Sequence, residues 1–378
     1  MFFYIGDSCD LLNKVDDNLF LDKGWQFTQK HDKKIYYKGY ILEGLLDNQL
    51  DNILEGKQPD GNWAVIVKDH EYRIHHSKFR GFPVYAKDNV KTNLNLPGLD
   101  YVINAGELGI DYSVDLSVDI VSVKAKTILS NNCLSLYRTY KQPLEIHVSG
   151  GMDTTSVIAV CEACEIPYTL HMKPFKEYFK TLQEASGTVT EYTSPLVEFC
   201  RNTYEFCRYA SIYNDKKLVT GYMGDGIFAR SPWQLALIAN SLNLTLGEVV
   251  KETDYIYSYI KRGANNHLFN RLQTIGNVKK ELETNHANSD LMWHIDNTYY
   301  LSPFMSSKIY EAVLSLSVED LLRVGPDALI QKHIIKDACP ELLMTLDTQK
   351  NTLDSTRNFY QNIEKVNLKS CVKKNILV

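Results

Sequence analysis

Residues 146–155 carry the side chains best suited to chemistry on a phosphate, in the order IHVSGGMDTT. An apolar run ends in a small glycine-rich turn, which predicts a strand, a phosphate-binding loop and the start of a helix. The first N–H groups of a helix lack partners within it and carry partial positive charge, so they attract anions. Gly150 and Gly151 let the main chain approach a phosphate, and Ser149, Thr154 and Thr155 add hydroxyl groups.

Asp153 adds a carboxylate to this predicted loop. Because a carboxylate repels phosphate oxygens unless a cation lies between them, the loop also predicts a magnesium ion. The alternative role of Asp153 is a helix N-cap. The spacing differs from the Walker loop, which needs a Lys after its glycines, and from G-x-G-x-x-G.

A second glycine-rich turn carries a second acid. Residues 217–228 read KLVTGYMGDGIF, so another strand-like run leads into a turn that contains Asp225. Asp153 and Asp225 both follow predicted strands, and a triphosphate bridged by one or two magnesium ions would lie between them. The alternative for Asp225 is an ordinary turn acid.

The first segment resembles the S-G-G-x-D-[ST] loop of the ATP pyrophosphatase family. The second is similar to the S-G-E-G-x-D-E-x-F turn of the asparagine synthetases within that family. Later segments also resemble asparagine synthetases: residues 302–306 look like the P-F-L-D turn, and residues 331–336 and 348–350 look like the K-H-x-L-R helix and the R-x-K turn. The resemblance implies a carbon–nitrogen ligase that converts ATP to AMP and pyrophosphate.

The same resemblance implies a set of site residues, with ATP and Mg²⁺ as cofactors. Asp153 and Asp225 are the implied metal ligands. Lys350 would stabilise charge on the intermediate and on the departing pyrophosphate, and Lys332 would contact phosphate; an exposed surface lysine is the alternative for each. Thr348 replaces the family's Arg, so the hydrogen bonds to phosphate are expected to differ at this position. The implied contacts with ATP or pyrophosphate are Val148, Ser149, Gly150, Gly151, Asp153, Thr154, Thr155, Met172, Gly221 and Lys332.

Tyr222 stands where an asparagine synthetase has Glu. In this respect the chain is similar to β-lactam synthetase and carbapenam synthetase, where a tyrosine supported by an acid helps to deprotonate an amine of the substrate itself. A phenol with a pKa of about 10 matches an alkylammonium better than a carboxylate of about 4.3 does. The alternative is an aromatic ring packed under the loop. Asp290 and Asp296 are the candidate acid partners.

The pattern divides the chain into residues 1–115 and residues 116–378. The first part alternates short β-rich runs with turns, in the runs Lys34 to Leu42, Asn62 to Lys68, Tyr72 to His76, Phe82 to Ala86 and Tyr101 to Ile103. Residues 61–67 and 82–85 resemble strands of the glutaminase domain of asparagine synthetases, an α+β fold with an N-terminal nucleophile. Residue 2 is Phe where those enzymes expose a Cys, and the first cysteine is Cys9. We therefore predict a degenerate domain without a nucleophile.

Residues 116–378 have an α/β pattern. Val118 to Tyr140 has apolar residues near helical spacing, and the run from Leu144 to Val148, a helix from Thr154 and the run from Tyr168 to Met172 form a predicted βαβ unit. That order implies a parallel sheet with ligands at the carboxyl ends of its strands. Predicted later helices are Glu248 to Arg262, Ser307 to Leu316 and Ala328 to Asp337. The resemblance implies an adenine-nucleotide α hydrolase-like synthetase domain with a helical C-terminal part.

Composition limits the classes of partner. A net charge of −5 over 378 residues argues against a dedicated nucleic-acid binder. No run approaches the roughly 20 apolar residues of a membrane span, and the short apolar start reads as a first strand, so we expect a cytoplasmic protein. The eight cysteines include the pairs Cys161/Cys164 and Cys200/Cys207, and buried free thiols are the prediction for both pairs.

These features together predict an ATP-dependent, AMP-forming amide ligase. Its substrate would be a small molecule or peptide that carries both the carboxylate and the amine, as in β-lactam synthetases or lasso-peptide cyclases. The alternatives are an ammonia-dependent synthetase, a nucleoside-modifying amide ligase, and a nucleotide-binding regulatory protein without catalysis. A homodimer is the assembly that this prediction allows.

Overall fold

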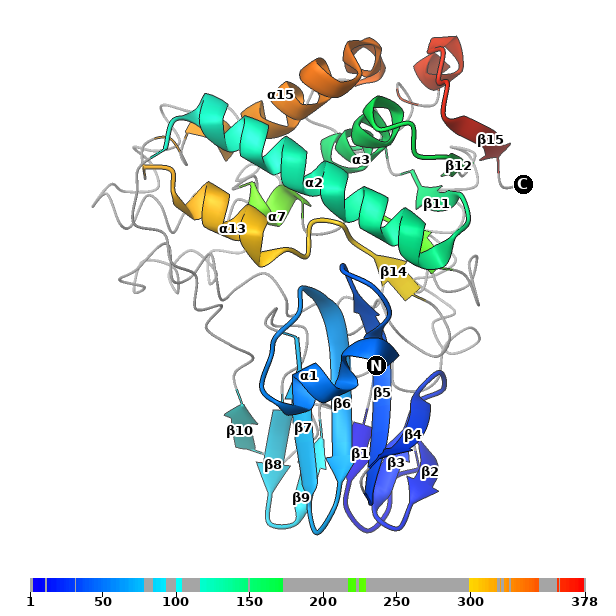
Figure 1. Ribbon diagram of the computed structural model, residues 1–378, viewed down its shortest axis with the longest axis vertical. Coiled ribbons are helices and arrows are strands. Elements are labelled where there is room, and N and C mark those ends of the chain that lie inside the picture. Colours follow the sequence, from blue (N-terminus) through cyan, green and yellow to red (C-terminus); the bar gives the residue numbers. More distant parts are fainter. Residues whose placement is uncertain are drawn as a thin grey trace, which may run out of the picture.

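The computed structural model describes residues 3–10, 12–30, 32–77, 84–92, 100–103, 116–148, 150–172, 217–221, 224–228, 299–317, 320, 323–325, 328–346, 359 and 361–376. These residues form a mixed α/β protein, with antiparallel sheets in the N-terminal part and a parallel sheet in the C-terminal part (Figure 1). The predicted α/β class is confirmed at this level.

The N-terminal part contains two antiparallel sheets. The larger has the order β10-β8-β9-β1-β3-β2 and the smaller has the order β4-β5-β6-β7. The larger sheet is built from β1 (Phe3–Ile5), β2 (Asn13–Asp16), β3 (Leu19–Leu21), β8 (Val84–Lys87), β9 (Val90–Thr92) and β10 (Asp100–Ile103). The smaller is built from β4 (Gln26–Lys30), β5 (Lys33–Ile41), β6 (Gly61–Lys68) and β7 (Tyr72–His76). All five predicted β-rich runs overlap strands.

Alternation along β5 and β6 explains why these two central strands of the smaller sheet are buried on both faces. Tyr36 and Ile66 pack on one side against residues of β1 and β3, which joins the two sheets. Tyr37 and Val65 pack on the other side against the short helices η1 (Leu46–Gln49) and α1 (Leu50–Leu54). The result is a layered arrangement of sheet, sheet and helix.

The C-terminal part is organised around a five-stranded sheet with the order β14-β13-β11-β12-β15, in which each strand runs parallel to its neighbours. The strands are β11 (Leu144–His147), β12 (Tyr168–Met172), β13 (Lys217–Val219), β14 (Tyr299–Leu301) and β15 (Cys371–Ile376). The chain runs from β11 to β12 on one side and returns to place β13 on the other side of β11. The strand order therefore reverses between β11 and β13.

Helices cover this sheet (Figure 1). The longest helix among the described residues, α2 (Val118–Tyr140), has the predicted bounds: the Ser117 hydroxyl accepts a hydrogen bond from the Ile120 amide, and Lys141 ends the helix in the left-handed region. The other helices that the structure describes in this part are α3 (Met152–Ala163), α7 (Gly224–Ile227), α13 (Ser307–Leu314), α15 (Leu329–Ala338), η4 (Pro340–Thr345) and η5 (Ile363–Lys365). The predicted helix at residues 248–262 lies outside the described residues.

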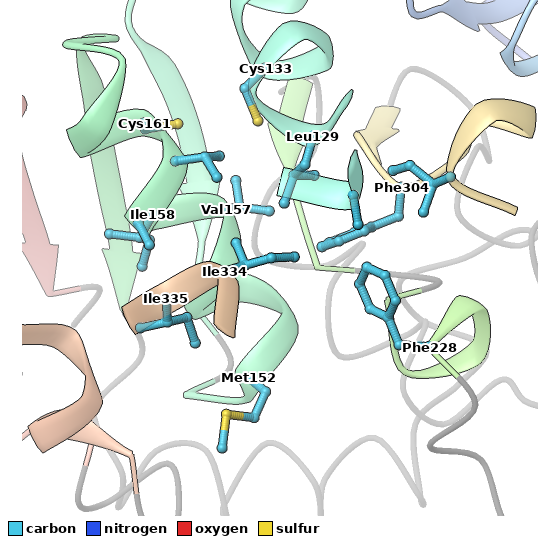
Figure 2. Packing of buried hydrophobic residues seen from close by; sticks show 14 of the residues in the cluster. Leu129, Cys133, Met152, Val157, Ile158, Cys161, Phe228, Phe304, Ile334 and Ile335 are labelled. Carbon is cyan, nitrogen blue, oxygen red and sulfur yellow. The ribbon is translucent and has the colours of Figure 1, made fainter. Parts of the chain in front are cut away.

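The main core lies where α2, α3 and α15 meet the sheet. Figure 2 shows Val157 and Ile158 of α3 near Ile334 and Ile335 of α15, and Leu129 of α2 beside them. Every residue of α3 from Thr154 to Cys161 is buried, as expected for a helix enclosed on all sides. None of the helices in the described ranges has both the length and the apolar character that a membrane crossing requires.

Candidate functional site

The loop after β11 leads directly into the N-terminus of α3. Gly150 has a φ of 77°, in the left-handed region where glycine is favoured, and Gly151 is the helix N-cap. The helix therefore begins at Met152, two residues before the predicted start. Asp153 is its second residue, so the N-cap alternative for Asp153 is wrong.

Residues around this loop are closely packed. Val148 is buried, and its amide donates to the carbonyl of His171 at 3.0 Å. Thr154 and Thr155 are also buried, and the Thr155 hydroxyl donates to the Gly151 carbonyl at 2.8 Å. The helix start is thus fixed by bonds within its own first turn. Met172, another predicted ATP contact, is the buried last residue of β12.

The turn after β13 lies directly against the first turn of α3. A Cβ built on Gly221 would stand 2.4 Å from the amide nitrogen of Thr154 and 2.8 Å from the Cβ of Asp153. A Cβ built on Gly224 would stand 2.7 Å from the Asp153 carboxylate oxygen Oδ1. Side chains at these two positions would collide with Asp153, so the close contact between the two turns depends on both glycines.

Helix α15 contributes the third side of this cluster. The Gln331 amide Nε2 donates to Asp153 Oδ1 at 3.1 Å, and Gln331 has no exposed surface. Lys332 follows it on the helix and is half-buried. Three of the segments singled out in the sequence, around Asp153, Gly221 and Gln331, therefore meet at one carboxylate.

The fourth segment, residues 302–306, packs against the second segment, residues 217–228. Phe228, one residue beyond α7, packs edge-on against Phe304 with ring centroids 5.7 Å apart (Figure 2). Ser302 follows β14, and the Leu301 carbonyl accepts from the Thr220 amide at 3.0 Å. The turn that contains Gly221 is therefore held by both strand pairing and aromatic packing.

Several predicted site residues lie outside the described residues. They are Ser149, Tyr222 and Lys350, as well as Thr348, Asp290 and Asp296. Only the backbone of Asp225 is described. It is the second residue of α7, directly after Gly224. Within the described ranges, no three His, Cys, Asp or Glu side chains gather in a way that could hold a metal ion.

The cysteine predictions have mixed outcomes. Cys161 is buried, but Cys164 is exposed, so the prediction is wrong for Cys164; α3 ends at Ala163, and Cys164 lies in the turn beyond it. A contact with Cys133 of α2, together with burial, raises the pKa of the Cys161 thiol well above its ordinary value. All six cysteines in the described part of the chain are free thiols, and Cys200 and Cys207 lie outside it.

Sequence reasoning did not identify two residues that shape this region. Gln331 was noted only as the start of a segment, although its spacing of three and four from the buried Ile334 and Ile335 places it on the same helix face. Asp60 lies in the N-terminal part and accepts hydrogen bonds from the Ser306 hydroxyl (3.1 Å) and the Ser307 amide (2.9 Å) at the start of α13. In comparisons with known proteins, the chain matches no protein-family model and no curated protein.

Proposed function

We propose that the protein is an ATP-dependent ligase that forms an amide through an acyl-adenylate and releases AMP and pyrophosphate. One observation carries the proposal: two glycine-rich turns, each following a parallel strand, meet at Asp153 where the strand order reverses. The carboxyl ends of parallel strands at such a reversal are the usual position of ligand sites in α/β sheets.

The main chain of this region suits a triphosphate. The positive φ of Gly150 and the N-cap at Gly151 present the backbone at the start of a twelve-residue helix. The N-terminal N–H groups of such a helix favour anions. A carboxylate at the same helix end, that of Asp153, suits an anion that arrives with a cation.

The residues also fit a magnesium ion. Asp153 and Asp225 are the proposed ligands, and both would supply the hard oxygen donors that magnesium prefers. Gln331 adds a buried side-chain oxygen, Oε1, that accepts no hydrogen bond from any described residue. A bound magnesium ion would neutralise charge on the phosphates as pyrophosphate departs.

The proposed reaction has two steps. A carboxylate oxygen of the substrate bonds to the α-phosphorus of ATP, and the bond to the bridging oxygen breaks, with its electron pair leaving on pyrophosphate. An amine then bonds to the carbonyl carbon, AMP leaves, and one proton is lost from the nitrogen. We assign Lys350 to stabilising the developing negative charge and Tyr222 to receiving the proton, on the register of the motifs in the sequence.

We further propose that residues 1–115 form a degenerate glutaminase-like domain and that residues 116–378 form an adenine-nucleotide α hydrolase-like synthetase domain. The first described strand supports this view, since Phe3 is fully buried and its carbonyl accepts from the Thr92 hydroxyl at 2.6 Å. An apolar strand built into the sheet offers no nucleophile. The amine would then belong to the substrate, in the manner of a ring-closing synthetase.

The glutaminase proposal has a direct test. Purified protein incubated with glutamine should release no glutamate above a heat-killed control. Steady release that depends on the folded protein would refute the assignment of a degenerate domain.

The ligase proposal is tested by the phosphate products. A panel of amino-carboxylic acids and peptides is screened for exchange of labelled pyrophosphate into ATP, which reports adenylation alone. Compounds that support exchange should then give AMP and pyrophosphate in equal amounts. Formation of ADP and orthophosphate would contradict the proposal, and tight binding of ATP without exchange or turnover would favour a regulatory protein.

A further inference from the structure

Gln331 is buried, and only the nitrogen of its side-chain amide has a hydrogen-bond partner among the described residues. Its Nε2 donates to Asp153 Oδ1, whereas its Oε1 has no exposed surface and accepts no hydrogen bond from any described residue. Buried side-chain oxygens are paired in the large majority of cases, and an unpaired one destabilises the fold. A Leu or Met at this position would avoid that penalty.

The orientation of the amide follows from Asp153. A carboxylate oxygen only accepts hydrogen bonds, so the nitrogen of the amide must face it and the oxygen must face away. Because Oε1 and Nε2 are bonded to the same carbon, Oε1 is near the carboxylate that Nε2 contacts, although it points away from Oδ1. The unpaired acceptor therefore belongs to the same cluster as Asp153, Gly221 and Gly224.

We propose that Gln331 is a positioning residue for a hydrated divalent cation at Asp153. Its Nε2 fixes the carboxylate, and its Oε1 accepts a hydrogen bond from a water molecule carried by the cation. Magnesium keeps most of its waters when it binds to proteins, and each such water is a strong donor. Outer groups of this kind orient the direct ligands of a metal. This inference rests on the proposed function, because it assumes that Asp153 holds a cation with ATP.

The test compares stability with affinity in Gln331→Met, which keeps the length of the side chain and removes both polar atoms. Asn132→Leu is the matched control: Asn132 is also a buried helical amide, and it donates to the Pro303 carbonyl at 2.8 Å away from Asp153. The probes are Mg²⁺ and a non-hydrolysable ATP analogue, measured by titration calorimetry, and unfolding in urea without ligand.

We expect Gln331→Met to leave the urea midpoint unchanged or raised and to weaken binding of the analogue roughly 10- to 100-fold. Higher Mg²⁺ should restore much of that affinity. Asn132→Leu should lower the midpoint and leave the affinity of the folded protein unchanged. A lowered midpoint in Gln331→Met, or an unchanged affinity, would overturn the role of Gln331 while leaving the ligase proposal intact. Failure of the unchanged protein to bind the analogue would overturn both.

Discussion

Gly221 and Thr154 are in contact through their backbones, so that a Cβ on Gly221 would lie 2.4 Å from the Thr154 amide nitrogen. No real Cβ approaches a backbone atom so closely, and neither backbone can move without separating the turn after β13 from the start of α3. This contact holds Gly221, at the start of the turn after β13, against the first turn of α3.

Gly221→Ala should therefore destabilise the protein by about 1–3 kcal/mol, the usual effect of overpacking, and weaken the binding of Mg²⁺ and ATP. Gly56→Ala is the control, because Gly56 has a φ of 91° and no atom lies within 4 Å of its added Cβ. That control should lose about 1–2 kcal/mol from backbone strain alone and retain full affinity. Equal affinity in the two variants, measured by calorimetry, would show that the contact does not shape a nucleotide site.

Asp60 links the antiparallel part of the protein to the start of α13 in the parallel part. Because its carboxylate accepts from Ser306 and Ser307, Asp60→Ala should lower the free energy of unfolding by about 1–2 kcal/mol. Glu43→Ala is the matched control: Glu43 lies 3.3 Å from Lys308 near the same helix end, but both side chains are exposed. It should lose no more than about 1 kcal/mol. Equal losses in urea unfolding would exclude a capping role for Asp60.

The carboxylate of Asp16 predicts a specific response to acid. Burial raises its pKa, but hydrogen bonds from Lys34, from the Asp17 amide and from Tyr36 outweigh burial and lower the pKa to about 2. The folded pKa is then below the ordinary value of 3.8, so the stabilisation is present above that value and is lost as the pH falls from about 4 to about 2. In urea titrations, Asp16→Asn should show a shallower loss of stability over this range than the unchanged protein. Parallel curves would contradict the assigned pKa.

Local sequence signals predicted much of the fold. The bounds of α2 match the run predicted from its apolar spacing, and β7 and β12 match the predicted runs. The parallel sheet followed from the strand, helix, strand order. Such features depend on residues that are close together in the chain.

The contacts that build the site could not be predicted in the same way. Gln331 and Asp153 are 178 residues apart, and Asp60 and Ser307 are 247 apart, so their meeting depends on how whole elements pack. The motifs placed Gly221 near the phosphate loop in principle, but only the structure reveals that the glycine is required by the Asp153 and Thr154 backbones. Cys164 was assigned wrongly because the pattern did not fix the end of α3.

Substitution of Tyr222 distinguishes the adenylation step of the proposed reaction from the amide-forming step. If its phenol receives the proton of the amine, Tyr222→Phe should leave pyrophosphate exchange nearly intact and slow amide formation roughly 10²- to 10⁴-fold. Lys350→Ala should impair both steps, because negative charge develops in each. Normal amide formation by Tyr222→Phe would leave the tyrosine with a packing role and remove the main support for ring closure.

The central claim, that Asp153 holds the cation of a bound nucleotide, is tested most directly by calorimetry with Mg²⁺ and a non-hydrolysable ATP analogue. Asp119 is a matched control, because it too is the second residue of its helix, α2, but its side chain is exposed and lies 3.7 Å from Nδ1 of the exposed His333. We predict that Asp153→Asn weakens binding at least about 100-fold, as expected when a charged partner of phosphate and metal is removed, whereas Asp119→Asn binds normally. Equal affinity of Asp153→Asn and the unchanged protein would contradict the account.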